Sequence, residues 1–94
     1  MPPAREKRPS QEVRETRAYR ATVAKLGAKI RELRHARALT LEAAAELASV
    51  DLKHLQKVEA GTLNVTLATL VRIAVGLGVE VRDLFPARPT RRAG

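Results

Sequence analysis

The residues best suited to recognition chemistry occupy one short segment, residues 52–60. Lys53, Gln56 and Lys57 fall on one side of a helix at 100° per residue, whereas the larger apolar residues of the segment fall on another side. Lysine can donate to the O6 and N7 acceptors of guanine, and glutamine can form two hydrogen bonds with adenine. Leu52, at the start of the segment, can contact a thymine methyl group. The segment is a candidate for contacting base edges in duplex DNA; the alternative is an ordinary solvated helix surface.

Other kinds of chemistry find little support in the residue types. The chain has no cysteine, and its two histidines, His35 and His54, lie far apart in sequence with no obvious carboxylate cluster beside them. We therefore expect two solvent-facing imidazoles and no metal site. No Ser, His and Asp set, phosphate-binding glycine loop or pair of carboxylates suggests an enzyme or a cofactor site. Tyr19 and Phe85 are the only aromatic residues, and we expect Phe85 in the core, which argues against binding single-stranded nucleic acid by stacking.

Positive charge is concentrated near the two ends of the chain. The 94 residues carry a net charge of +8, with six basic and three acidic side chains in residues 1–20 and three basic and no acidic ones in 86–94. Such an excess favours a polyanionic partner. We expect a basic arm at 1–20, helical from about residue 10, a domain at 21–86 and a basic tail at 87–94. No apolar run is long enough to span a bilayer and no signal peptide is evident, so we expect a cytoplasmic protein without a membrane partner.

The spacing of apolar residues indicates helices and gives no segment with the period of a strand. We expect an all-α bundle of five short helices. The expected elements are Ala21–Arg37, Leu41–Ala48 capped by Thr40, Leu52–Ala60 between Asp51 and Gly61, a helix from Thr66 to Gly78, and a final turn at Val81–Phe85. The apolar stripe of the fourth helix is expected at Leu67, Leu70, Val71, Ala74 and Val75.

The second and third helices are joined by a very short connection. Only Ser49 and Val50 separate the helix capped by Thr40 from the cap of the next helix at Asp51. Two helices joined so closely must cross steeply. This geometry allows one helix to lie over a phosphate backbone while the next enters the major groove.

Residues 26–85 resemble the lambda-repressor and Cro-like helix-turn-helix family, also called the Xre family. The resemblance rests on Leu26-Gly27, Ile30 to Arg34, Leu39-Thr40, Glu42, Ala45, Val50, Leu55, Val58-Glu59-Ala60-Gly61, Asn64, Thr66-Leu67, Leu70, Ile73-Ala74, Leu77-Gly78-Val79 and Leu84-Phe85. It implies a five-helix domain that binds double-stranded DNA. Residues 64–67 look most like the branch that contains restriction-modification controller proteins and small repressors.

The resemblance also implies roles for individual residues. Base edges would be faced by Leu52, Lys53 and Lys57, with Gln56 and His54 flanking them toward bases or phosphates. Phosphates would be held by Thr40, Thr62, Asn64 and the amides at the start of the helix capped by Thr66. Capping and turn formation are the simpler roles of these last residues, and the two roles are compatible.

One implied feature is structural, and three positions depart from the family pattern. Arg34 and Glu59 would form a buried or half-buried ion pair between the first helix and the third; the alternative is a solvated Glu59. Leu41 stands where family members usually have a phosphate-gripping Gln. Ser49 stands at a corner that is often Gly, which costs about 1 kcal/mol if φ there is positive. Ala44 replaces a common Leu.

Two functions of different classes fit these observations. The first is a transcriptional regulator, expected to act as a homodimer on a palindromic site. The second is a protein-interaction module, such as an antitoxin that masks a toxin and binds DNA only secondarily. Two surfaces are candidates for the dimer interface. One is the Tyr19 and Val23 side of the N-terminal helix, and the other is a C-terminal region with Val79, Val81 and Phe85. The basic arm either follows phosphates or serves solubility alone.

Overall fold

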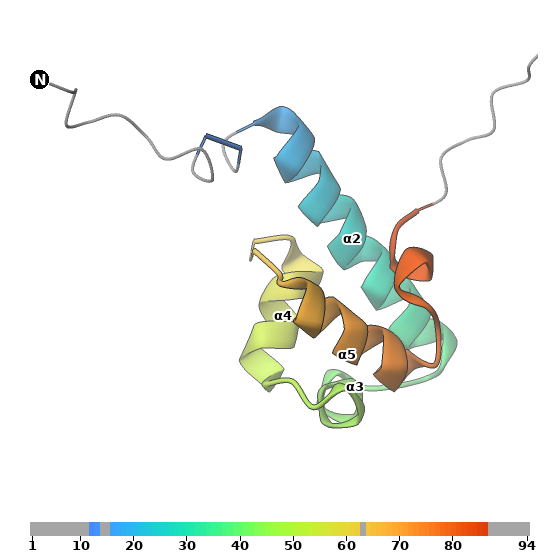
Figure 1. The fold of residues 1–94 in the computed structure, drawn as a ribbon. Helices are drawn as coiled ribbons and strands as arrows, with labels where there is room; N and C mark the ends of the chain where they lie inside the picture. The colour runs from blue at the N-terminus through green and yellow to red at the C-terminus, as the bar shows by residue number, and fades with distance from the viewer. Residues whose placement is uncertain (1–11, 14–15, 63, 87–94) are drawn as a thin grey trace, which may run out of the picture.

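The described residues fold into helices only. The computed structural model describes residues 12–13, 16–62 and 64–86 (Figure 1). Within them lie four α-helices and one 3-10 helix, namely α2 (Arg17–Ala36), α3 (Leu41–Ala48), α4 (Leu52–Ala60), α5 (Leu67–Leu77) and η1 (Val81–Leu84). The all-α class is confirmed. The expected fifth element is a single 3-10 turn here.

Local capping sets the helix boundaries. Thr40 and Thr66 start α3 and α5 by accepting a hydrogen bond from a backbone amide of the first turn, and Asp51 does the same for α4. Gly61 and Gly78 end α4 and α5 in the left-handed conformation, with φ of 73° and 72°. The bounds of α3 and α4 agree with those expected from sequence.

Helix α2 begins earlier than the expected start at Ala21. The side chain of Thr16 caps it by accepting from the backbone amide of Tyr19 at 3.1 Å, so the first helical residue is Arg17. The boundary expected between residues 20 and 21 therefore falls inside α2. The expected helical start near Ser10 and the tail at 87–94 lie outside the described residues.

Two helix pairs form most of the core, α2 with α4 and α3 with α5. The buried apolar residues are Leu26, Ile30, Ala44, Ala45, Ala48, Leu55, Val58, Leu70, Ile73, Ala74, Leu77 and Leu84. Gly27 allows α2 and α4 to touch, because a Cβ there would press against the carbonyl oxygens of Val58 and Glu59 and lie 2.6 Å from the latter. Gly27 interrupts neither α2 nor its hydrogen bonding; it serves this close contact.

The expected apolar stripe of α5 is partly wrong. Ile73 and Leu77 face the core, whereas Leu67 is 68% exposed, Val75 71% and Val71 43%. Because α5 carries apolar residues on nearly every side, its periodicity does not single out the packed face. The exposed residues instead form an apolar ridge (Leu67, Val71 and Val75), spaced four residues apart along one side of α5.

The C-terminal turn also corrects an expectation. Leu84 is fully buried, whereas Phe85, which we expected in the core, is 37% exposed. In a 3-10 turn adjacent side chains point in different directions, so only one of these two neighbours can enter the core.

Candidate nucleic-acid interface

The corner between α3 and α4 has a defined geometry. Ser49 adopts the left-handed conformation, with φ of 57°, and its backbone amide donates to the carbonyl of Glu46 at 3.1 Å. The amide of Val50 donates to the carbonyl of Ala45 at 3.0 Å. Together these bonds close the C-terminus of α3, and the next residue, Asp51, already caps α4. The positive φ considered for Ser49 is present, so the steric cost of a non-glycine residue in this conformation applies at the corner.

Helix α4 has one packed face and one exposed face. Leu55, Val58 and Glu59 are buried. The residues expected to read bases lie on or beside the opposite side: Lys53, Gln56 and Lys57 are exposed, and Leu52 is half-buried against the core. Among the described residues, no hydrogen bond or ion pair engages the side chains of Lys53, Gln56 or Lys57. These three polar side chains are therefore available for contacts outside the domain.

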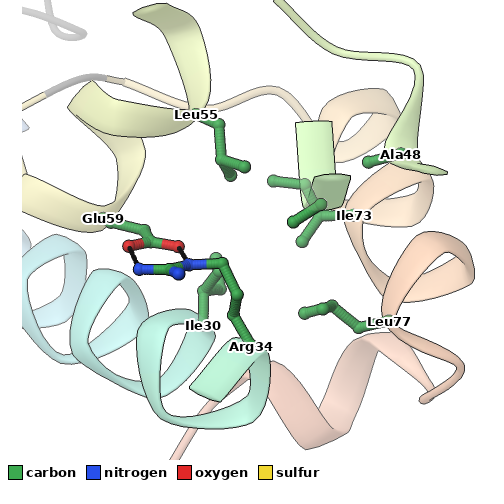
Figure 2. Close-up of a pocket in the computed structure, with 8 residues that line it drawn as sticks. Ile30, Arg34, Ala48, Leu55, Glu59, Ile73 and Leu77 are labelled. Atoms are coloured by element: carbon green, nitrogen blue, oxygen red, sulfur yellow. Dashed lines mark hydrogen bonds and ion pairs between the residues drawn. The ribbon is translucent and has the colours of Figure 1, made fainter. Parts of the chain in front are cut away.

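A buried ion pair fixes the orientation of α4 on α2. The Nε and Nη2 atoms of Arg34 donate to the two carboxylate oxygens of Glu59 at 2.7 and 3.0 Å (Figure 2). Nη1 of Arg34 donates to the carbonyl of Leu39 at 2.8 Å. The hydrogen bond with Glu59 raises the pKa of Arg34 above its usual value, against an opposing effect of burial. The bidentate geometry restrains α4 against rotation about its own axis.

The ion pair closes the centre of the domain. Figure 2 shows Arg34 and Glu59 beside Ile30, Leu55 and Leu77, and the small hollow between these residues has no room for a water molecule. Arg31 adds a weaker contact from the surface, with its Nε 3.5 Å from Glu59 Oε1. The hollow belongs to the packing of the domain and offers no space for a small-molecule ligand.

The residues expected to hold phosphates are spread over three places. Thr40 and Thr66 lie at the N-termini of α3 and α5, and Asn64 and Thr62 lie on the connection between α4 and α5. The hydroxyl of Thr62 donates to the carbonyl of Lys57 at 3.3 Å. All four are exposed, although Thr40 and Thr66 also serve as caps. Thr40 and Thr66 are therefore accessible for phosphate contacts in addition to their capping role.

His54 differs from our expectation. The imidazole is half-buried rather than solvent-facing, and its Nε2 is buried without a hydrogen-bond partner among the described residues. His35 is exposed, as expected. On the helical wheel His54 lies between Val58 of the packed face and Lys57 of the exposed face, so it flanks the exposed face of α4.

Sequence reasoning missed one side-chain contact near the site. The hydroxyl of Tyr19 donates to Oδ1 of Asn64 at 3.0 Å, linking α2 to the connection between α4 and α5. The two residues are 45 positions apart. Residue spacing carries no information about a partner so distant in sequence.

Neither a metal cluster nor a membrane span occurs in the part of the chain that the structure describes. No three His, Asp or Glu side chains there gather in a way that could hold a metal ion. No described helix combines the length and apolar character needed to cross a bilayer.

The family follows from comparison with known proteins. A family model described as a helix-turn-helix domain matches residues 25–86, about two thirds of the chain. The chain belongs to the helix-turn-helix family. Its likeness to solved structures places it among the Xre-like members, which are DNA-binding transcription regulators. A comparison with curated protein sequences found no match.

Three similar solved structures illustrate this membership. The restriction-modification controller protein C.AhdI from Aeromonas hydrophila is 38% identical with a TM-score of 0.66; the alignment covers 67% of this helix-turn-helix chain and 96% of C.AhdI. The clp gene regulator ClgR from Corynebacterium glutamicum is 31% identical with a TM-score of 0.63, and 66% of each chain is covered. A helix-turn-helix transcriptional regulator from Vibrio cholerae is 30% identical with a TM-score of 0.68; the alignment covers 70% of this chain but only 37% of that regulator.

Proposed function

We propose that this helix-turn-helix protein is a sequence-specific transcriptional regulator that binds double-stranded DNA through α4. The observation that carries the proposal is the exposed face of α4, where Lys53, Gln56 and Lys57 stand without partners among the described residues while a buried ion pair fixes the helix from behind. With Leu52 at the helix start, these side chains would contact base edges in the major groove. The similarity to the restriction-modification controller protein C.AhdI supports the same role.

Backbone contacts would set the register of this complex. We assign them to Thr40, Thr62, Asn64 and Thr66, with His54 flanking, because the four polar residues are exposed on the connections next to α3, α4 and α5. Hydroxyls, amides and helix N-termini suit phosphate oxygens. Such contacts add affinity without discriminating between sequences. The basic arm at 1–20 and the tail at 87–94 would add further electrostatic attraction.

We further propose a homodimer on a palindromic site in the cytoplasm, in a five-helix arrangement with η1 as the fifth element. The apolar ridge of α5, with Phe85, supports this proposal, because single-domain monomers rarely leave apolar side chains so exposed along one helix side. Half-sites would then lie about one helical turn apart. Val71→Glu together with Val75→Glu should convert a dimer to a monomer in light scattering, whereas unchanged mass would reject this surface.

Selection of bound duplexes from a random pool tests the function directly. A regulator of this type should enrich one motif, and a homodimer should enrich it as an inverted repeat. Equal affinity for selected and scrambled duplexes at every salt concentration would refute sequence-specific binding. No cofactor and no catalytic step are part of the proposal.

A protein-interaction module is the second candidate function, and the apolar ridge of α5 also favours it. Such a ridge could dock a toxin or another effector instead of a second copy. Co-purification of a stoichiometric second polypeptide, together with failure to enrich any DNA motif, would favour this alternative.

A further inference from the structure

Helix α2 reaches beyond the part of the chain that matches the helix-turn-helix family. The match starts at residue 25, whereas α2 starts at Arg17. Thr16 anchors this start: its hydroxyl donates to the carbonyl of Val13 at 2.7 Å and accepts from the amide of Tyr19 at 3.1 Å. Residues 17–24 are therefore two capped helical turns in front of the matched segment, here called the added turns.

These two turns are docked on the connection that follows α4. The Tyr19 hydroxyl donates to Asn64 Oδ1 at 3.0 Å. At Gly61 the backbones approach closely, since a Cβ there would lie 2.9 Å from Cα of Ala24 and 3.3 Å from the carbonyl oxygen of Val23. Two separate contacts thus fix the direction of the added turns relative to the proposed phosphate-binding connection.

The added turns present arginines on the side that meets α4. At 100° per residue, Arg17 and Arg20 fall on the same flank of α2 as Ala24 and Arg31, the residues through which that flank approaches Gly61 and the α4 carboxylate. Both arginines are exposed, and no ion pair engages them among the described residues.

The charge of the added turns does not favour the helix itself. The first turn of α2 contains no acidic residue, and Arg17 and Arg20 lie near the positive end of the helix dipole. The described part of α2 therefore offers these cations no favourable partner, and an anion outside it can. Of the five basic residues from Thr16 to Arg31, Lys29 and Arg31 pair with Glu32 and Glu59, and no acidic residue lies within this stretch. The remaining cations favour an anionic partner.

We infer that the first two turns of α2 form a clamp for DNA backbone phosphates flanking the half-site contacted by α4. The clamp, defined here as Arg17, Tyr19 and Arg20, rests on the proposed function. Arg17 and Arg20 bind phosphates next to those held by the connection between α4 and α5. Tyr19 is a positioning residue. Because Asn64 Oδ1 accepts a hydrogen bond from the Tyr19 hydroxyl, the Nδ2 group of Asn64 is left to donate to a phosphate.

Salt dependence on duplexes of two lengths tests the arginines. Both duplexes carry the selected site, and one extends roughly half a helical turn further on each side. On the longer duplex, the full chain with Arg17→Gln and Arg20→Gln should lose about 0.9 per arginine from the slope of log K against log[salt]. On the trimmed duplex the two arginines have no phosphates to contact, so the variant should match the wild type.

Lys25→Gln is the matched control, because Lys25 is an exposed cation on another flank of α2, directly after the added turns. For the Lys25→Gln variant, the slope of log K against log[salt] should change by less than half of the change expected for each arginine. Equal changes per charge for the lysine and arginine variants, or equal losses on both duplexes, would overturn the clamp in favour of general charge attraction. Wild-type binding that fails to prefer the selected site would overturn both the clamp and the proposed function; preference with no arginine effect would overturn the clamp alone.

A double-mutant cycle tests the positioning role. Tyr19→Phe keeps the ring and removes only the hydroxyl, so affinity should fall about two- to tenfold for every sequence while the melting temperature stays unchanged. In an Asn64→Ala background the same substitution should have no further effect. Additive losses, or a fall in melting temperature that accounts for the affinity change, would show that Tyr19 does not act through Asn64.

Discussion

The two faces of α4 differ in what holds them. The inward face is fixed by Val58 against Gly27 of α2 and by Glu59 in its bidentate pair with Arg34. The outward face carries Lys53 and Lys57, whose side chains have no partner among the described residues. One face is saturated with contacts inside the domain, and the other has its hydrogen-bonding capacity open.

This contrast separates stability from recognition within a single helix of nine residues. Changes on the inward face should lower the free energy of unfolding and affect DNA binding only through the folded fraction. Changes on the outward face should leave stability nearly untouched and affect binding directly. A substitution that changes both the free energy of unfolding and the DNA affinity of the folded protein would contradict this separation.

Arg34→Met should have the largest effect. It leaves Glu59 buried with only the contact of Arg31 at 3.5 Å, and an uncompensated buried charge costs roughly 3–5 kcal/mol. We expect a loss near the lower end, about 3 kcal/mol, in chemical denaturation. Arg34→Met combined with Glu59→Met should be less damaging than Arg34→Met alone, since no charge remains buried. A double variant less stable than the single one would mean that the pair contributes net stability beyond charge compensation.

Gly27→Ala should have the next largest effect. The new Cβ would press against the carbonyl oxygens of Val58 and Glu59, which belong to the backbone and cannot rotate away. We expect an overpacking cost of about 3 kcal/mol, reduced by about 1 kcal/mol through the better helix propensity of alanine. Ala28→Gly, the reverse change at the exposed neighbouring position, should cost only about 1 kcal/mol. A Gly27→Ala protein more stable than the wild type would show that α2 and α4 can move apart without cost.

The sequence predicted features of the fold that depend on neighbouring residues. Thr40, Asp51 and Gly61 bound α3 and α4 where expected, because a cap acts on amides and carbonyls only a few residues away. Arg34 and Glu59 were paired through the family resemblance, not through their spacing. The structure contains that pair.

Features that depend on tertiary packing were predicted less well. In α5 the helical period fits several faces. The packing of α5 against α3 decides which face is buried, and it leaves Val71 and Val75 exposed. Phe85 and Leu84 compete for one site in the core, and their sequence alone does not decide between them. The roles of the outward residues of α4 stay predictions.

Lys53→Ala and Lys57→Ala probe the outward face. Each should relax the preference at one defined base pair, at a cost of about 1–3 kcal/mol in binding, and we expect values near the lower end for a single lysine donor. Urea denaturation should show a free energy of unfolding within about 0.5 kcal/mol of the wild type, as for surface substitutions in general. A uniform loss across all duplexes would instead assign the lysine concerned to phosphate binding.

Ser49→Gly tests the corner that connects the two helices, and its effect should be the smallest and of opposite sign. Ser49 has a φ of 57°, a conformation that glycine adopts without the steric cost of a Cβ. Because glycine also gains entropy in the unfolded chain, the net stabilisation should be about 0.5–1 kcal/mol, measured as a rise in the denaturation midpoint. Ala43→Gly, inside α3, provides the control and should destabilise by about 1 kcal/mol. If Ser49→Gly also changed sequence preference under conditions where all of the protein is folded, the corner would set the angle at which α4 meets DNA. The separation between the two faces would then no longer hold.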